Sequence, residues 1–194
     1  MFAEERPATM TIEEYRAFER ASPLRHEYYH GQVYAMAGGT RRHSRLGRRL
    51  ATLLAVAMGD DSPCEVFNSD MRFCLSESVL VYPDVTVSCD EHDLDNDEED
   101  EIYKPRLVVE VLSRSTEHRD RGRKLRDYQA CPSIMEYGLV NTAYQSVEIY
   151  RREAVGGSYR RFESDEAAEF ASVDVRIPLA TLYARTAIPT TPQE

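Results

Sequence analysis

A buried strand followed at once by a helix is the feature of this chain that most restricts its fold. Residues 105–130 read PRLVVEVLSRSTEHRDRGRKLRDYQA. Residues 107–112 form a continuous apolar run apart from Glu110, which is typical of a strand buried on both faces. A buried carboxylate costs several kcal/mol unless a proton, a cation or a metal ion compensates it. The sequence therefore predicts a partner for Glu110, and the nearest supply is the following helix, with Lys124 on it.

The rest of the pattern predicts one domain, residues 1–194, of mixed α/β or α+β class, with a central mixed sheet flanked by helices. Apolar residues at helical spacing predict helices at 11–22, 41–58 and 116–130, the first with Thr11 as N-cap and Glu14 completing a capping box. Aromatic and β-branched residues around Gly31 predict a hairpin or two short strands at 26–37. Apolar and alternating runs predict strands at 64–75, 79–89, 107–112, 135–140, 147–151, 159–162 and 173–177. We expect loose tails at 1–8 and 187–194.

The formal net charge of −10 argues at first against a nucleic-acid partner. Nine acidic residues and no Lys or Arg fall within the expected acidic loop at 90–101, so the remainder of the chain is close to neutral. Arginines gather in two clusters, at 41–49 and 114–126. The overall charge therefore neither supports nor excludes a polyanionic substrate.

The four cysteines, at positions 64, 74, 89 and 131, are scattered without a CxxC pair. This pattern is typical of reduced thiols in a cytoplasmic protein, and no zinc site is expected. The N-terminus lacks the basic and apolar regions of a secretory signal. No window approaches the ~20 consecutive apolar residues that cross a bilayer. We therefore expect a cytoplasmic protein without a membrane partner.

Two acidic residues are the leading candidates for chemistry. Asp84 follows Pro83 in one predicted strand, and Glu110 lies in the middle of the next. If these strands pair, the two carboxylates can converge on one hard cation such as Mg²⁺ or Mn²⁺. The alternatives are that Asp84 is a strand-edge acid and that Glu110 forms a buried ion pair with an arginine. Glu27 is a third acid, for which a salt bridge is the alternative.

Lys124 is one of only two lysines in the chain. Its compact ammonium group differs from a guanidinium in having an adjustable pKa. It lies one helical turn from Asp120, so a catalytic role and an i,i+4 ion pair both account for it. His43 lies within the first arginine cluster, where a solvated position on a helix is its default interpretation.

Several segments of the sequence together resemble a known protein family. They are HEYYHGQVYAMAGGTRRHS, SDMRF, YPDVTVSC, PRLVVEVLSRST, the helix with Asp120, Lys124 and Tyr128, and EYGLV. In this order, over roughly residues 10–183, the chain resembles the Uma-type family of restriction endonucleases in the PD-(D/E)XK superfamily. The resemblance implies a restriction-endonuclease-like core that acts with one or two Mg²⁺ ions.

The resemblance also implies roles for single residues. In the superfamily the Asp of the PD pair and the Glu of the (D/E)XK strand hold the metal, and they match Asp84 and Glu110. Glu27 matches a further acid of the family near the site. The chain departs from the superfamily at the lysine, because Leu112 stands two residues after Glu110. The resemblance makes Lys124 the substitute.

We therefore expect a metal-dependent endonuclease that hydrolyses phosphodiester bonds in DNA. Asp84 and Glu110, with Glu27 and the carbonyl of Val111, hold the ion, while Lys124 orients water or stabilises negative charge. The arginines expected to contact phosphates are Arg41, Arg42, Arg45, Arg114, Arg121 and Arg123. A homodimer would suit the cutting of both strands. The alternative is a nuclease-like fold that no longer cuts and serves as a binding module, which Leu112 and the acidic loop favour.

Overall fold

The computed structural model describes residues 9–36, 38–95, 98 and 100–192. Within these residues the larger of two main sheets has six strands. Its order is β11 (Gly157–Glu163), β10 (Ser146–Arg152), β9 (Glu136–Val140), β8 (Pro105–Val111), β6 (Val85–Ser88) and β3 (Glu65–Asn68). Neighbouring strands run antiparallel except β8 and β9, which are parallel. The sheet is therefore mixed, as predicted.

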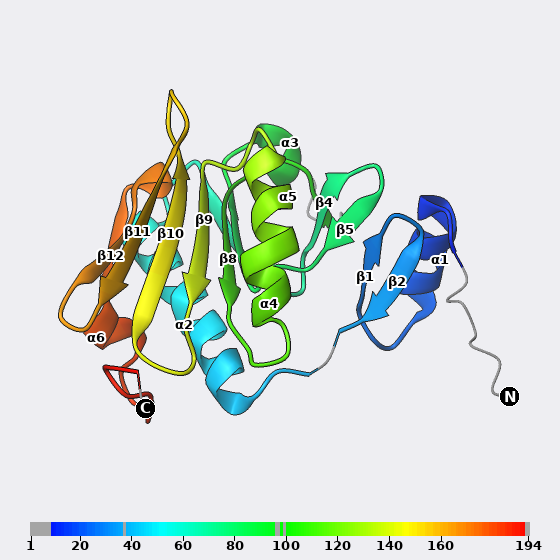
Figure 1. Cartoon of the computed structure of the whole chain (residues 1–194). Coiled ribbons are helices and arrows are strands. Elements are labelled where there is room, and N and C mark those ends of the chain that lie inside the picture. Colours follow the sequence, from blue (N-terminus) through cyan, green and yellow to red (C-terminus); the bar gives the residue numbers. More distant parts are fainter. Residues whose placement is uncertain (1–8, 37, 96–97, 99, 193–194) are drawn as a thin grey trace, which may run out of the picture.

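The smaller sheet lies beside the larger one and carries the N-terminal helix (Figure 1). Its order is β2 (Gln32–Ala35), β1 (His26–Tyr29), β5 (Val79–Val81), β4 (Arg72–Ser76) and β7 (Glu101–Ile102). The helix α1 (Ile12–Ala21) begins with the predicted capping box between Thr11 and Glu14. Tyr15 of this helix packs against Tyr28 and Leu80 of the sheet. The remaining strands, β12 (Ala167–Phe170) and β13 (Val175–Pro178), form a ribbon.

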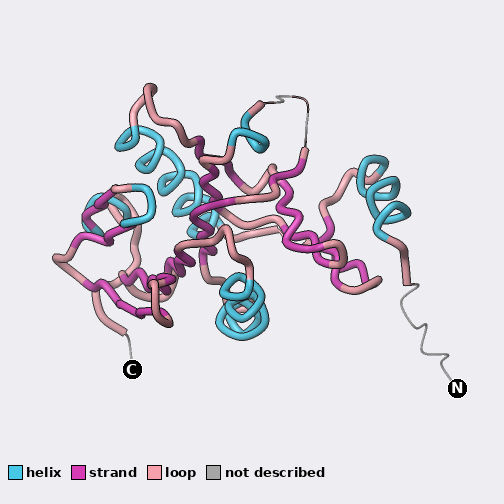
Figure 2. The backbone as a smooth tube through the Cα atoms, turned by 90° about the horizontal axis from the view of Figure 1, so that it is seen from above, coloured by secondary structure: helices cyan, strands magenta, loops and turns pink. Residues whose placement is uncertain are grey.

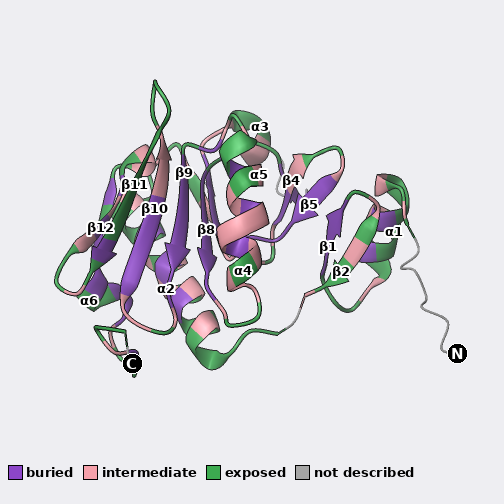
Figure 3. Cartoon of the chain, in the orientation of Figure 1, coloured by how far each residue is buried: buried purple, intermediate pink, exposed green. Residues whose placement is uncertain are grey.

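Helices cover both faces of the larger sheet, as Figures 1 and 2 show from two directions. On one face α2 (Arg41–Met58) buries Leu46, Leu50 and Leu54 against residues that include Val109. On the other face lies a helical segment, 117–130, whose Tyr128 packs against Val108. This segment consists of α4 (Glu117–Arg119), the π-helix η1 (Asp120–Lys124) and α5 (Leu125–Ala130). Figure 3 shows β8 and β9 buried between these layers.

The remaining helices among the described residues are short: α3 (Glu91–Leu94), the 3₁₀-helix η2 (Ala171–Val173) and α6 (Leu179–Leu182). No described helix has the length and apolar character needed to cross a membrane.

The two long strands predicted at 64–75 and 79–89 are each divided between the two sheets. β3 and β6 belong to the larger sheet, whereas β4 and β5 belong to the smaller one. The chain passes between the sheets at 69–71 and again at 82–84. Pro83 has no N–H to offer a sheet ladder, which favours the second break. Asp84 therefore lies at a crossing between the sheets, directly before β6, and not within a strand.

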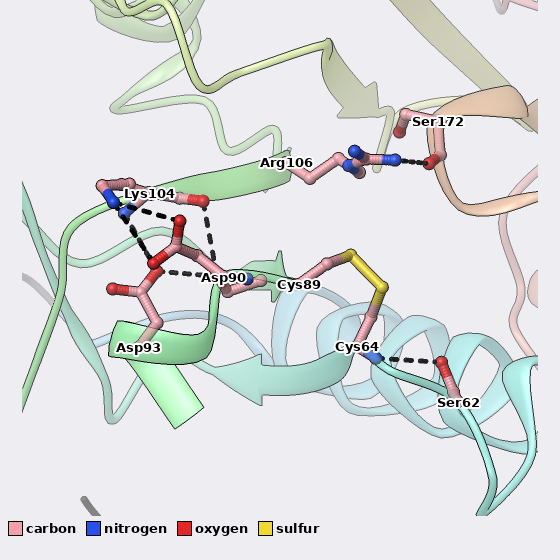
Figure 4. Close-up of a disulfide and its surroundings, with 9 residues drawn as sticks. Ser62, Cys64, Cys89, Asp90, Asp93, Lys104, Arg106 and Ser172 are labelled. Carbon is pink, nitrogen blue, oxygen red and sulfur yellow. Dashed lines mark hydrogen bonds and ion pairs between the residues drawn. A yellow bond between two sulfur atoms is a disulfide. The ribbon is translucent and has the colours of Figure 1, made fainter. Parts of the chain in front are cut away.

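A disulfide joins Cys64 and Cys89, and the expectation that all four cysteines are reduced is wrong (Figure 4). β3 pairs with β6 so that Glu65 lies opposite Ser88. The two cysteines flank this pair, and their Cα atoms are 4.0 Å apart. The cause is a strand register that the spacing of the cysteines along the chain does not reveal. Cys74 and Cys131 are free thiols.

The acidic segment is fastened to the start of β8. Asp90 forms an ion pair with Lys104, and Asp93 accepts hydrogen bonds from the backbone N–H groups of Tyr103 and Lys104. Lys104, Asp90 and Asp93 lie together in Figure 4. Residues 91–94 form α3, while 96, 97 and 99 lie outside the described residues. The expected loop is thus partly helical.

The C-terminal segment 187–192 is packed onto the domain, in contrast to the loose tail that we expected. Ile188 is buried in the core on the α2 face of the larger sheet. The side chain of Gln145 donates a hydrogen bond to the carbonyl of Ile188, and the backbone N–H of Gln145 donates to the carbonyl of Pro189. Residues 1–8 and 193–194 lie outside the described residues.

Candidate active site

The candidate acids lie at one end of strands β6 and β8. These strands pair, with Val85 opposite Val109, and extending the register by one residue brings Asp84 opposite Glu110. The backbone N–H of Val111 donates to Asp84 Oδ2 at 2.7 Å. The pairing therefore brings the carboxylate of Asp84 against the residue that follows Glu110.

Glu110 is 4% exposed and lies on the sheet face covered by segment 117–130. Lys124 Nζ lies 2.8 Å from Glu110 Oε1, and the hydroxyl of Tyr128 donates to the same oxygen at 2.9 Å. Burial raises the pKa of Glu110 to about 8, and the negative charges of Asp120 and Asp84 act in the same direction, while Lys124 opposes them. The cation beside Glu110 is thus a lysine, and the alternative of an arginine is wrong.

Lys124 Nζ connects acids from the two sheets. It lies 2.8 Å from Glu27 Oε1 on β1 as well as from Glu110, whereas Asp120 on its own helix is 4.0 Å away. Burial opposes the ammonium form, but the carboxylates of Glu110 and Glu27 raise the pKa of Lys124 well above 10.5. Glu27 is also paired with Arg119, so the predicted salt bridge of Glu27 is present. Lys124 therefore remains charged at neutral pH.

The π-helix Asp120–Lys124 gives this cluster its geometry. Both of its end residues are buried, which is unusual for charged side chains on a surface helix. Burial raises the pKa of Asp120, while Lys124, 4.0 Å away, and the side-chain hydrogen bond with Thr116 act in the opposite direction. Single π turns within α-helices are frequent at functional sites. The turn is therefore a second, backbone-level indication of a site here.

His43 is a residue of the site that sequence reasoning had assigned to solvent. It lies near the start of α2, and its Nε2 is 3.1 Å from Asp84 Oδ2. The hydrogen bond to Asp84 raises the pKa of His43. A Cβ atom at position 39 would lie 2.8 Å from His43 Nδ1, so Gly39 allows the imidazole to pack in this place. The sequence signal is a glycine pair and the N-cap Thr40 directly before His43.

Asp84 and Glu110 each use one carboxylate oxygen for their contacts. The partners of Asp84 meet Oδ2 and those of Glu110 meet Oε1, and the other oxygens accept no hydrogen bond from the described residues. No cluster of three or more His, Cys, Asp or Glu side chains in the described ranges could hold a metal ion. Mg²⁺ needs no such cluster, because it keeps several waters and takes one or two carboxylates. The free carboxylate oxygens of Asp84 and Glu110 are of the ligand type that Mg²⁺ takes.

The arginines predicted to contact phosphate occupy two kinds of environment. Arg121 is bound by both oxygens of Glu148, at 2.7 and 2.8 Å, and Arg123 lies 3.9 Å from the ring centre of Tyr29. These two are engaged within the protein. The other four are exposed, and of these Arg45 also donates a hydrogen bond to the carbonyl of Arg185: Arg41, Arg42, Arg45 and Arg114.

Comparison with known proteins supplies a family. The family model "Uma2: Putative restriction endonuclease" matches residues 12–184. An uncharacterized protein of Synechocystis sp. is 35% identical over 176 residues, which cover 90% of this chain and 91% of that protein. A second uncharacterized protein of this organism is 33% identical over 144 residues, which cover 74% of this chain and 81% of that protein.

A solved structure supports the predicted fold class. The crystal structure of a "putative nuclease belonging to DUF820" from Anabaena variabilis is similar, with a TM-score of 0.69 and 17% identity. The similarity covers 90% of this chain and 98% of that one. The expected nuclease-type fold, a mixed sheet flanked by helices, is confirmed.

Proposed function

The chain belongs to the Uma2 family of restriction-endonuclease-type proteins, and on this premise we propose that it is a metal-dependent endonuclease that hydrolyses phosphodiester bonds in DNA. The observation that carries the proposal is the contact between the buried Glu110 and Lys124 beside Asp84. Buried acids with raised pKa values that lie beside a specific charged partner are typical of catalytic sites.

Asp84 and Glu110 would hold a Mg²⁺ or Mn²⁺ ion through the oxygens that the protein leaves free, with the carbonyl of Val111 and water as further ligands. Such an ion, when bound, lowers the pKa of a water molecule and neutralises charge on a phosphate. Two contacts hold Asp84 ready for this role, the hydrogen bond from the Val111 N–H and the contact with His43. His43 is therefore a positioning residue.

Lys124 acts as a charge and as a hydrogen-bond donor. Because its pKa is raised well above 10.5, it cannot accept a proton at neutral pH. It can orient a water molecule or stabilise negative charge that develops on the phosphate. Glu27 fixes the position of the ammonium group from the opposite sheet. The four exposed arginines Arg41, Arg42, Arg45 and Arg114 contact the phosphate backbone without reading the bases.

A plasmid nicking assay tests the proposal. Wild-type protein is expected to nick supercoiled DNA with Mg²⁺ or Mn²⁺, to lose this activity in EDTA, and to lose it in the Glu110→Ala variant. Glu163→Ala, a change at an exposed acid of β11, is the control that should nick as the wild type does. Equal nicking by wild type and Glu110→Ala, or none by either across salt concentrations, would refute the proposal. Oligomeric state stays a prediction.

A further inference from the structure

One side of the proposed site is closed to any substrate. Glu27, Glu110, Asp120 and Lys124 are each no more than 6% exposed. Segment 117–130 covers them, and the ion pair of Arg119 with Glu27 connects that segment to the smaller sheet. A phosphate group cannot approach the buried acids from this side without moving a helix.

The opposite side of the site is open. A groove of about 900 Å³ runs along α2, and Asp84 and His43 line it together with Gly47. A Cβ atom at Gly47 would lie 3.8 Å from the side chain of Val111 and 4.0 Å from that of Asp84, so the helix passes close to both. The other wall is formed by residues 23–25 and by Val66, Asn68 and Ser69. We call this space the α2 groove.

The α2 groove differs in charge from the protein as a whole. Asp84 is the one carboxylate among the described residues that line it, against the guanidinium groups of Arg25 and Arg48. Arg25 is partly neutralised by an ion pair with Asp70 at the rim. The acidic segment with α3 follows the far end of β6, at the opposite end of the sheet from the start of α4 (Figure 1). None of the described residues of this acidic segment lines the groove.

The wall formed by α2 presents polar side chains at regular spacing. Ser44, Arg48 and Thr52 follow one another at single helical turns, are exposed, and line the groove. The hydroxyl of Thr52 donates to the carbonyl of Arg48, so Ser44 and Arg48 are the donors that face the groove. Most contacts of proteins to DNA are made to phosphate and sugar by such hydroxyl and guanidinium groups, and by backbone N–H groups. The glycines at positions 38 and 39 leave backbone accessible at the mouth of the groove.

We propose that the α2 groove receives the sugar–phosphate backbone of the DNA strand that is cut, so that the scissile phosphate reaches Asp84 from the α2 side. The inference rests on the proposed function and extends it by naming the surface that binds the substrate. The helix with Arg121 and Arg123, which the sequence favoured as a DNA contact, closes the other side of the site.

Charge reversal within the α2 groove tests the inference. Ser44→Glu and Thr52→Glu, combined in one variant, place two negative charges on the wall without altering any acid or cation of the site. The matched control is Val56→Glu, on the same helix, at a residue that is 75% exposed and lies outside the groove. Binding of a fluorescein-labelled DNA duplex in EDTA is measured by anisotropy, and plasmid nicking is measured with Mn²⁺.

The double variant is expected to bind DNA at least about tenfold more weakly and to nick correspondingly more slowly, whereas Val56→Glu stays within about twofold of wild type. Thr52→Arg, which places a positive charge on the same wall, is expected to bind more tightly, and circular dichroism of the double variant checks that it is folded. If wild type nicks DNA and the double variant binds and nicks as Val56→Glu does, the groove inference is wrong and the proposed function stands. If wild type neither binds nor nicks, both are wrong.

Discussion

Glu110 and Glu148 are two buried carboxylates in one row of the larger sheet, and they are neutralised in different ways. Leu139 on β9 lies opposite Glu110 on one side and opposite Glu148 on the other. Both acids receive a cation from the same π turn, Lys124 for Glu110 and Arg121 for Glu148. The comparison therefore holds sheet, depth and helix nearly constant while the cation changes.

The difference lies in how completely each acid is satisfied. Arg121 binds both oxygens of Glu148, and Tyr159 adds a third hydrogen bond. Burial opposes ionisation there, but the hydrogen bonds from Arg121 lower the pKa of Glu148. Glu110 receives its contacts on one oxygen and stands among further acids, and its pKa is raised. A saturated acid of the first kind stabilises a fold, whereas one of the second kind retains the capacity to bind another cation.

The largest expected difference is in catalysis. Lys124→Ala should lower the rate of plasmid nicking by about 10²–10⁴-fold, because it removes the ammonium group that contacts the proposed metal ligand Glu110. Arg121→Ala should leave the rate per folded molecule within a few-fold of wild type. The rate of nicking with Mn²⁺, normalised to folded protein, distinguishes the two. Equal losses in both variants would show that the two ion pairs serve the same purpose.

Arg121→Ala is expected to lower stability. Arg121→Ala leaves the buried Glu148 without its bidentate partner, and breaking a buried pair of this kind costs about 3 kcal/mol. Urea denaturation monitored by circular dichroism gives the free energy of unfolding. Arg161, 3.5 Å from Glu148 in the wild type, is the cation that could reduce this loss. An unchanged free energy of unfolding in Arg121→Ala and in Arg121→Ala with Arg161→Ala would contradict a structural role for this pair.

The smallest difference is in pH dependence, where the two acids have opposite signs. Because the pKa of Glu110 is raised from 4.5 to about 8, its contribution to stability falls as pH rises between these values. The pKa of Glu148 is lowered, so its contribution is complete above pH 4.5 and is lost as pH falls below that value.

Free energies of unfolding of Glu110→Gln and Glu148→Gln, measured from pH 4 to pH 8 in the range set by these pKa values, test this difference. Relative to wild type, Glu110→Gln should become more stable as pH rises towards about 8. The destabilisation caused by Glu148→Gln should diminish only below pH 4.5. Parallel curves for the two variants would contradict the opposite shifts.

Much of the fold could be predicted because many of its helices and strands are determined by residues close to one another in the sequence. The capping box at Thr11 and the apolar stripe of α2 each depend on residues within a few turns of one another. The expected burial of Glu110 was enough to predict that it has a partner, and in the structure Lys124 is that partner. The predictions of single long strands at 64–75 and 79–89 were wrong. The apolar pattern continues where the chain crosses from one sheet to the other, and only the second crossing is marked in the sequence, by Pro83.

The features that escaped prediction depend on contacts between distant segments. His43 reaches Asp84 only because α2 approaches the sheet near Gly47, which no spacing along the chain reveals. The pairing of Cys64 with Cys89 depends on the register of β3 against β6. The environment of Arg121 depends on Glu148 of β10, which lies 27 positions further along the chain. In each case the missing information was the identity of a neighbour in space.

Because of the π-helix Asp120–Lys124, the geometry of the site depends on the number of residues between its charged side chains. Its hydrogen bonds span one residue more than those of an α-helix, and each residue of an α-helix turns the chain by about 100°. Removal of Gly122 alone would therefore change the angle between Arg121 and Lys124, with every charged group still present. An insertion or deletion between Arg121 and Lys124 would disturb the pairing of the two acids with their cations without replacing any of the four charged residues.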